Sequence, residues 1–285
     1  MFWSTITRGN DLRDFPFVAV LRAACLLIVL AGPTSTAMGD DWDIADPGLP
    51  YTEAQFELTE GTWMSLVVSP DGRSIVFDLL GDIYRIPAAG GDATLVHGGP
   101  AIQVTPSFSP DGSSILYISD GSGSDNVWMS DAEGGDARQI TRETVDVLAG
   151  PVWDPRGPYI AAAKRYDSFT TIRSSEIRLF HVDGGDGRVL VETPANKRDV
   201  HEADFSTNGR YLYYTERVSN PSIFADANHK NFAINRRDLE SGTIDEVASG
   251  FGSAMAPQVS PDGNRLAFVR RVKHKTVLFL SLIHI

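Results

Sequence analysis

The sequence predicts an all-β protein, a β-propeller of four-stranded antiparallel blades, with four complete blades and a truncated fifth. Three observations lead to this prediction: a recurring Ser-Pro-Asp-Gly marker, a Gly-rich marker that follows it, and strand-like runs between the two. The first marker, identical or varied, stands at 69–72, 109–112, 154–157, 206–209 and 260–263, with spacings of 40, 45, 52 and 54 residues. Two turn signals that keep their order at such spacings are typical of propeller blades.

Strands are expected on both sides of each marker. A run rich in Ile, Val, Phe or Tyr follows the first marker in every repeat, which favours strands at 74–78, 114–119, 159–163, 211–215 and 265–269. A second run precedes the Gly-rich marker, at 82–86, 126–130, 176–182 and 232–238, with 276–280 as its counterpart in the fifth repeat. The Gly-rich marker stands at 90–92, 134–136, 184–186 and 241–243. We expect a short strand before the first marker and another after the Gly-rich marker, which together complete a four-stranded blade.

The markers are interpreted as hairpin connectors. Pro fixes the φ angle of a turn, Asp hydrogen-bonds the backbone beyond it, and Gly accepts positive φ. A calcium loop would need clustered oxygen donors, which the marker lacks. Aromatic residues recur beside the markers, and we interpret them as a packing layer between blades rather than as a ligand-stacking row: Trp63, Phe108, Trp128, Trp153 and Phe205.

Residues 1–37 have the layout of a secretory signal peptide. Basic residues precede an apolar run at 23–31, and Ser35 and Ala37 form a small-x-small cleavage site. The run is far shorter than the roughly 20 residues of a spanning helix. We therefore expect cleavage after Ala37, a leader at 38–56, the propeller at 57–285, and a periplasmic or secreted protein without a membrane span.

Composition narrows the function classes. Of 285 residues, 42% are hydrophobic and 22% charged, which argues against a disordered or collagen-like chain. The 25 Lys and Arg against 37 Asp and Glu give a net charge of −12, which argues against a nucleic-acid partner. The single cysteine, Cys25, excludes a disulfide framework and a multi-cysteine zinc site.

The order of Ser-Pro-Asp-Gly, strand and Gly-Gly-Asp resembles the propeller repeats of TolB and of the tricorn protease. Residues 60–65, Glu-Gly-Thr-Trp-Met-Ser, lead into 69–72 and 75–84 in a way that is similar to the opening blade of TolB-like propellers fused to secreted amidohydrolases. The resemblance covers about residues 57–280. Because a metal-dependent hydrolase barrel follows the propeller in those fusions, it implies a C-terminal catalytic domain as the partner.

No catalytic constellation is recognisable in the chain itself. Its histidines form no H-x-H pair and stand singly in different repeats: His97, His181, His201, His229, His274 and His284. A G-x-S-x-G nucleophile elbow and a Walker-type phosphate loop are also absent from the sequence. We therefore expect no catalytic residue, cofactor or metal site in this chain, and whether it belongs to an enzyme is left open.

A binding face is expected where the loops vary. With strands a to d in each blade, the markers are the a–b and c–d turns on one side of the disk. Length variation falls on the opposite side, in the b–c loops at 79–81, 120–125, 164–175 and 216–231. The early repeats are acidic on this side, whereas the later ones carry a basic arc: Lys164, Arg165, Arg173, Lys197, Arg198, Arg217, Arg270, Arg271 and Lys273. The arc either docks an acidic surface, attracts an anionic substrate, or only solvates long hairpins.

Three functions remain open. The first is the non-catalytic propeller of an exported amidohydrolase-type hydrolase, which serves as a protein-interaction or substrate-access module. The second is a free-standing periplasmic protein-binding propeller, and the third is the propeller of a prolyl oligopeptidase-type serine peptidase. Because the fifth repeat stops after its third strand, we expect the sequence to be a fragment, with residues 281–285 as a non-native tail.

Overall fold

The computed structural model describes residues 57–166, 174–193, 199–218 and 231–282, together with Ile44, Pro50 and Thr52. The chain divides into two compact units, Met1–Trp42 and Asp43–Ile285. All of the described strands belong to the second unit, and no α-helix occurs within the described residues. The predicted signal peptide and nearly all of the leader lie outside the described part.

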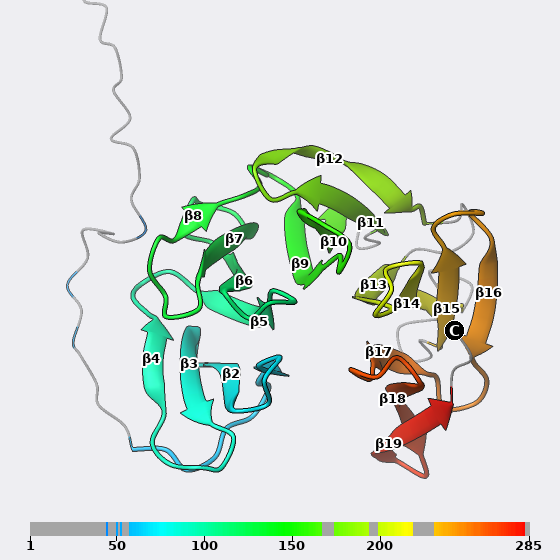
Figure 1. The fold of residues 1–285 in the computed structure, drawn as a ribbon, viewed down its shortest axis with the longest axis horizontal. Helices are drawn as coiled ribbons and strands as arrows, with labels where there is room; N and C mark the ends of the chain where they lie inside the picture. The colour runs from blue at the N-terminus through cyan, green and yellow to red at the C-terminus, as the bar shows by residue number, and fades with distance from the viewer. Residues whose placement is uncertain are drawn as a thin grey trace, which may run out of the picture. The chain divides into compact units, whose positions relative to one another are not determined.

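Five antiparallel sheets follow one another along the chain (Figure 1). Blade 1 holds β1 (Leu66–Val68), β2 (Ser74–Leu79), β3 (Asp82–Pro87) and β4 (Thr94–His97). Blade 2 holds β5 (Gln103–Phe108), β6 (Ser114–Ser119), β7 (Asn126–Asp131) and β8 (Arg138–Gln139). Blade 3 holds β9 (Val147–Trp153), β10 (Tyr159–Tyr166), β11 (Ser174–His181) and β12 (Gly184–Val191). Blade 4 holds β13 (Val200–Phe205), β14 (Tyr211–Arg217), β15 (Phe232–Asp238) and β16 (Ile244–Ala248). Blade 5 holds β17 (Met255–Val259), β18 (Arg265–Val272) and β19 (Lys275–Leu282).

The predicted fold class is confirmed. Blades 1 to 4 are four-stranded and blade 5 has three described strands, each paired with its neighbours in chain order. The runs predicted after the first marker are the second strands, and those predicted before the Gly-rich marker are the third strands. In blade 5, β19 continues through Ser281 and Leu282, which pair with Leu266 and Arg265, so the first two residues of the expected tail extend the strand.

The first marker is a self-contained hairpin turn. In blade 2 the Ser109 hydroxyl donates to Asp111 Oδ1 at 2.6 Å and accepts the Ser114 N–H at 2.9 Å. Asp111 Oδ1 also accepts the Ser113 N–H, and Gly112 takes a φ of 73°. The hydrogen bond from Ser109 is the main reason that the pKa of Asp111 falls to about 2. The Asp side chain is thus used within the turn, as the sequence predicts.

Ser109→Ala is expected to cost about 1 kcal/mol of unfolding free energy, because the partly buried Ser114 N–H loses its acceptor. The pKa of Asp111 should rise at the same time, since its strongest hydrogen bond is lost. Chemical denaturation and an NMR titration of the carboxyl group measure both effects. Ser113→Ala is the matched control, because its hydroxyl donates to Asp111 but accepts no backbone N–H from the described residues. Equal losses of stability in both variants would contradict the role proposed for the Ser109 hydroxyl in the turn.

The core consists of layers between successive blades. Phe108 and Tyr117 lie with Val76 and Ile83 between blades 1 and 2, and Trp128 packs against this layer. Trp153 packs against the layer between blades 2 and 3, and Phe205 is buried in the layer between blades 3 and 4, with other apolar side chains. The predicted packing role is therefore confirmed for Phe108, Trp128, Trp153 and Phe205. It is wrong for Trp63, which precedes the first strand and is fully exposed at 101%.

The first strand of blades 2 to 5 carries the same irregularity. One residue adopts positive φ, and the pairing with the second strand shifts there: Thr105, Gly150, Glu202 and Ala256. Two of these bulges hold neighbouring blades together. The Thr105 N–H donates to Asp78 of blade 1 at 2.7 Å, and the Ala256 N–H donates to Glu202 of blade 4 at 2.8 Å. The bulges thus turn a backbone N–H toward a side chain of the preceding blade.

Candidate functional site

The face formed by the b–c and d–a loops is reached by the ends of several strands. Lys164 and Arg165 lie in β10, Arg217 in β14, and Arg270 and Arg271 in β18, so these residues of the predicted basic arc belong to hairpin strands rather than to loops. The hairpins continue the antiparallel ladder toward this face, with Lys164 opposite Glu176 and Arg270 opposite Val277. Three members of the arc lie outside the described residues: Arg173, Lys197 and Arg198.

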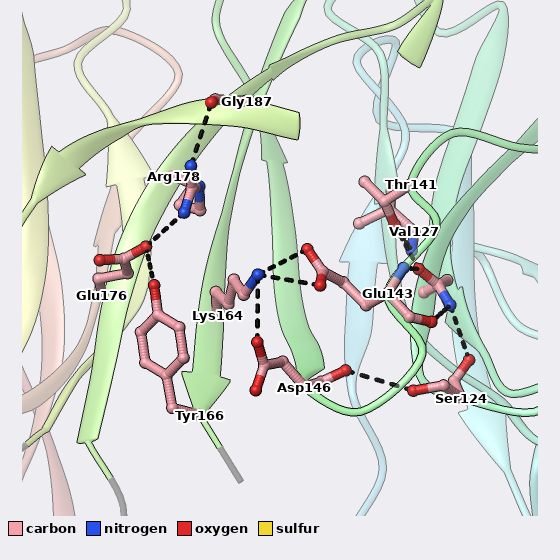
Figure 2. Close-up of polar contacts among 11 residues, drawn as sticks. Ser124, Val127, Thr141, Glu143, Asp146, Lys164, Tyr166, Glu176, Arg178 and Gly187 are labelled. Carbon is pink, nitrogen blue, oxygen red and sulfur yellow. Dashed lines mark hydrogen bonds and ion pairs between the residues drawn. The ribbon is translucent and has the colours of Figure 1, made fainter. Parts of the chain in front are cut away.

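Lys164 is the centre of a charged cluster at the junction of blades 2 and 3 (Figure 2). Its ammonium lies 2.9 Å from both carboxylate oxygens of Glu143 and 3.2 Å from Asp146. Its side chain is only 12% exposed, and the ammonium sits 5.4 Å from the centre of the Tyr166 ring. Burial lowers the pKa of Lys164, but the hydrogen bonds and negative charges of Glu143 and Asp146 outweigh it and raise the pKa overall.

A second group of contacts in blade 3 extends this cluster. The Tyr166 hydroxyl donates to Glu176, whose carboxylate also accepts from Arg178 at 2.8 Å. Arg178 donates from its other terminal nitrogen to the Gly187 carbonyl of β12 at 3.2 Å. Figure 2 shows the two groups side by side on adjacent strands. The Lys164 cluster, defined as Glu143, Asp146, Lys164, Tyr166, Glu176 and Arg178, therefore pairs its charges internally.

Asn126 fixes the loop that supplies the two carboxylates of blade 2. Its side-chain oxygen accepts from the Thr141 hydroxyl at 2.9 Å and from the Glu143 N–H at 2.7 Å. Its amide nitrogen donates to the carbonyls of Ser124 and Glu143. The Ser124 hydroxyl donates to the Asp146 carbonyl at 3.2 Å. The Asn126 side chain thus provides hydrogen-bond partners for backbone groups of the d–a loop. These bonds fix the loop in a conformation in which Glu143 and Asp146 lie close to Lys164.

An open groove of about 340 Å³ runs beside the Lys164 cluster, between the end of blade 2 and the outer hairpin of blade 3. It is lined at one end by Glu143, Lys164 and Arg178 and at the other by the turn at 183–186. At the first end, Glu143 pairs with Lys164, and Arg178 pairs with Glu176. The ion pairs of the Lys164 cluster therefore hold two neighbouring blades together.

The sequence analysis assigned Glu143 and Asp146 to an acidic arc and Lys164 to a separate basic arc. In the structure the two arcs meet and neutralise each other at the junction of blades 2 and 3. Arg270 also has an internal role, because its guanidinium donates to the carbonyls of Ser249, Phe251 and Ser253 and so fixes the d–a loop before blade 5. The structure therefore leaves a smaller set of exposed cations than the basic arc suggests.

Three exposed cations lie close together at the turn between β18 and β19. Arg271, Lys273 and Lys275 are exposed, and we refer to them as the basic turn. Lys273 and His274 adopt φ values of 47° and 71°, and Val272 pairs with Lys275 across them. Two residues with positive φ between paired strands are the geometry of a tight type I′ hairpin, which follows the natural twist of the ladder. Among the described residues, no carboxylate forms an ion pair with the basic turn.

The described histidines belong to separate contacts. His97 meets the Ser130 hydroxyl at 2.8 Å, His181 lies near Asp183, and His201 lies between Asp199 and Glu202. Burial lowers the pKa of His97 despite the nearby charge of Asp131. Within the described ranges, no three His, Cys, Asp or Glu side chains come together in a way that could hold a metal ion. A search of the same residues found no helix with the length and apolar character needed to cross a membrane.

Sequence reasoning found the face and several of its cations but missed the residues that neutralise or position them. Glu176 and Arg178 are two residues apart in one strand, a spacing that places both side chains on the same side of the sheet. Their proximity could therefore have been predicted from the sequence. The role of Asn126 could not be predicted from the sequence, because its hydrogen-bond partners lie up to 17 residues away across a loop. Arg165 and Arg217, two further members of the predicted basic arc, lie near the ends of β10 and β14 on this face.

Comparisons with known proteins agree with this geometry. The curated protein YidR of Escherichia coli K12 is 25% identical over 109 residues, which is 38% of this chain and 24% of YidR. The Tol-Pal system protein TolB of Bordetella pertussis is 39% identical over 59 residues, 20% of this chain and 14% of that protein. The chain thus spans at most about a quarter (24%) of these curated relatives.

A solved structure described as a putative TolB from Agrobacterium tumefaciens superposes with a TM-score of 0.61 at 20% identity, covering 77% of this chain and 76% of that one. At this identity the likeness shows the fold alone. The family model described as the TolB beta propeller domain matches residues 55–232, more than half of the sequence. The chain therefore belongs to the TolB beta propeller domain family.

Proposed function

We propose that this chain is a protein-binding propeller module of an exported protein, and that the basic turn docks an acidic surface of its partner. The observation that carries the proposal is the exposure of Arg271, Lys273 and Lys275 on a tight hairpin in a chain whose net charge is −12. A fixed cluster of like charges focuses the local field, which steers an oppositely charged surface and selects against basic ones. Two other described cations of this face, Lys164 and Arg270, are engaged within the fold.

As the specific partner we propose a hydrolase domain of amidohydrolase type. The propeller would shield this domain or steer the access of substrate to it. What supports it is the similarity of residues 60–65 and 75–84 to the opening blade of such fusions. A free-standing periplasmic propeller and a prolyl oligopeptidase-type peptidase remain the alternatives. Export to the periplasm or the exterior is proposed from the signal-peptide layout of residues 1–37.

Lys273→Glu with Lys275→Glu is expected to weaken binding of an acidic polypeptide strongly. The probe is fluorescein-labelled poly-L-glutamate, measured by anisotropy with the full chain at low salt. The wild type should bind despite its net negative charge, and binding should weaken as salt screens the basic turn. The double substitution should weaken it at least about tenfold, since charged contacts at an exposed site together contribute one to two kcal/mol.

Arg73→Glu with Arg188→Glu is the matched control. It changes the net charge by the same amount, and both side chains are exposed away from the basic turn. Equal weakening by the two double substitutions would show that only net charge matters and would contradict the proposed docking site. Retained binding in the variant with Lys273→Glu and Lys275→Glu would also contradict the proposed docking site.

The proposal also predicts the outcome of a hydrolysis assay. The purified chain should not hydrolyse amide, lactone or ester model substrates, with or without added divalent metal, because the proposed role is binding. The measurement is product release at high protein concentration, with and without a chelator. Activity that copurifies with the chain and survives chelation would contradict the non-catalytic role and favour serine-type chemistry.

A further inference from the structure

A groove of about 490 Å³ lies at blade 3 on the marker side, the side on which the a–b and c–d turns lie. Its lining comes from the turn at 154–159, from Leu179 of β11 and from Arg188 of β12. Blade 3 shares one core layer with blade 2 and another with blade 4, so both sides of its sheet are covered by a neighbouring blade. The volume of the groove falls within the range of small-molecule sites.

The first marker of blade 3 differs from those of the other blades. In blades 1, 2, 4 and 5 a Ser hydroxyl bonds to the Asp or Asn at the third position. In blade 3 the carboxylate comes first, as buried Asp154, and Arg156 takes the third position; its Nε and Nη2 donate to Asp154 at 3.0 and 2.7 Å. Among the described residues, no hydrogen bond uses Nη1 of Arg156. The turn therefore holds a fixed guanidinium group, 45% exposed, at the groove.

The outer strand of blade 3 differs as well. β12 has eight residues, against four, two and five in β4, β8 and β16. Its pairing with β11 shifts between Leu179, which pairs with Arg188, and His181, which pairs with Gly184. A bulge of this kind changes the direction of the neighbouring side chain. Arg188 is exposed, and within the described ranges its guanidinium forms no hydrogen bond or ion pair. Two departures from the repeat thus bring two arginines to one groove.

An apolar wall stands beside the two guanidinium groups. Tyr159 is 42% exposed, and its ring meets the edge of the His181 ring at 5.1 Å. The register pairs Ala161 with Leu179 and Leu179 with Arg188, so the side chains of Tyr159, Leu179 and Arg188 lie on the same side of the sheet. The groove therefore combines an aromatic ring and an aliphatic side chain with an unpaired cation.

We propose that this groove binds a small aromatic carboxylate. The planar guanidinium of Arg188 matches a carboxylate with two parallel hydrogen bonds, and Nη1 of Arg156 offers a further donor. The ring of the ligand covers Tyr159 and Leu179, which supplies the apolar contact. Because one exposed charge contributes little by itself, recognition requires the ring and the carboxylate together. This requirement separates the groove from the basic turn, which selects by charge and lies at the b–c end of its blade.

The test is saturation-transfer difference NMR with the full chain and phenylacetate. Wild type should bind with a dissociation constant on the order of a millimolar, as expected for a ligand of this size. Phenylacetamide has the ring without the charge, and acetate has the charge without the ring; each should bind at least about fivefold more weakly. Equal affinity for phenylacetate and phenylacetamide would overturn the proposal, as would inorganic phosphate that displaces phenylacetate at a lower concentration than acetate does.

Substitutions locate the binding. Arg188→Gln should weaken phenylacetate at least about fivefold and leave phenylacetamide unchanged, because only the charged contact is lost. Tyr159→Thr should weaken both ligands, since it removes the ring and keeps a strand-forming residue. Arg73→Gln is the matched control, an exposed arginine beside the first marker of blade 1, and should change neither affinity. Retained preference for phenylacetate in Arg188→Gln, unchanged binding in Tyr159→Thr, or an equal loss in Arg73→Gln would each contradict the proposed site.

Discussion

Lys164→Met is expected to lower the free energy of unfolding by roughly 3 kcal/mol at neutral pH, as found when one partner of a largely buried ion pair is removed. Methionine fills the space of the lysine stem, so the loss comes from charge. Glu143 and Asp146 lose the ammonium that they share, at side-chain exposures of only 18% and 22%.

Urea denaturation of the full chain measures this effect. Lys275→Met is the matched control, because Lys275 is exposed at the basic turn and its removal should change stability little. Adding Glu143→Gln to Lys164→Met should recover part of the loss, since it removes one of the two uncompensated charges. A loss no greater than about 0.5 kcal/mol in the single variant would mean that the Lys164 cluster behaves as an exposed ion pair.

Asp204→Asn is expected to remove a decline in stability that the wild type shows as pH rises toward neutrality. Asp204 is partly buried in β13, where it accepts the Val259 N–H of blade 5 at 2.7 Å. Burial raises its pKa to about 7, although hydrogen bonds from Val259 and Phe205 oppose the shift. The folded state therefore keeps a proton that the unfolded state releases at its ordinary pKa of 3.8.

The sign follows from proton linkage. Between about pH 4 and pH 7 the folded state binds more protons at Asp204, so its contribution to stability falls as pH rises and is constant beyond either limit. The full shift corresponds to roughly 4 kcal/mol, and because the side chain keeps some contact with solvent we expect about 2 kcal/mol. Asparagine keeps an oxygen for the Val259 N–H and carries no charge.

The measurement is the difference in unfolding free energy between Asp204→Asn and wild type at several pH values. This difference should grow in favour of the variant from pH 4 to pH 7, while groups common to both proteins, such as His97, cancel. Asp92→Asn, at the exposed turn after Gly91, is the control for the loss of one carboxylate charge. A flat difference for Asp204→Asn would show that its carboxyl group titrates normally.

The repeat could be predicted because its signals are local. Ser109, Asp111 and Gly112 interact within six residues of chain, so the turn chemistry can be recognised from their order alone. The strands between such turns inherit their register, which explains why the second and third strands of each blade were predicted closely. Trp63 was misassigned because its place beside the marker resembles that of the buried aromatics, whereas no earlier described blade packs over it.

The candidate site depends on contacts between repeats, and these leave weaker signals. Lys164 and Glu143 are 21 residues apart and meet only because Asn126 holds the intervening loop. A sum of charges along the chain treats them as members of different arcs. The basic turn could be predicted because its cations are close together in sequence, but its tight geometry depends on positive φ at Lys273 and His274, which is uncommon for lysine.

Among the described residues, the bonds that cross between blades reach only the next blade: Thr105 to Asp78, Lys164 to Glu143, and Ala256 to Glu202. An array with nearest-neighbour coupling unfolds like a row of linked units, in which each internal junction helps to decide whether both halves melt together. The Lys164 cluster occupies such a junction, between blades 2 and 3. Its ion pairs therefore contribute to the cooperativity of unfolding, because they couple blades 1 and 2 to blades 3 to 5.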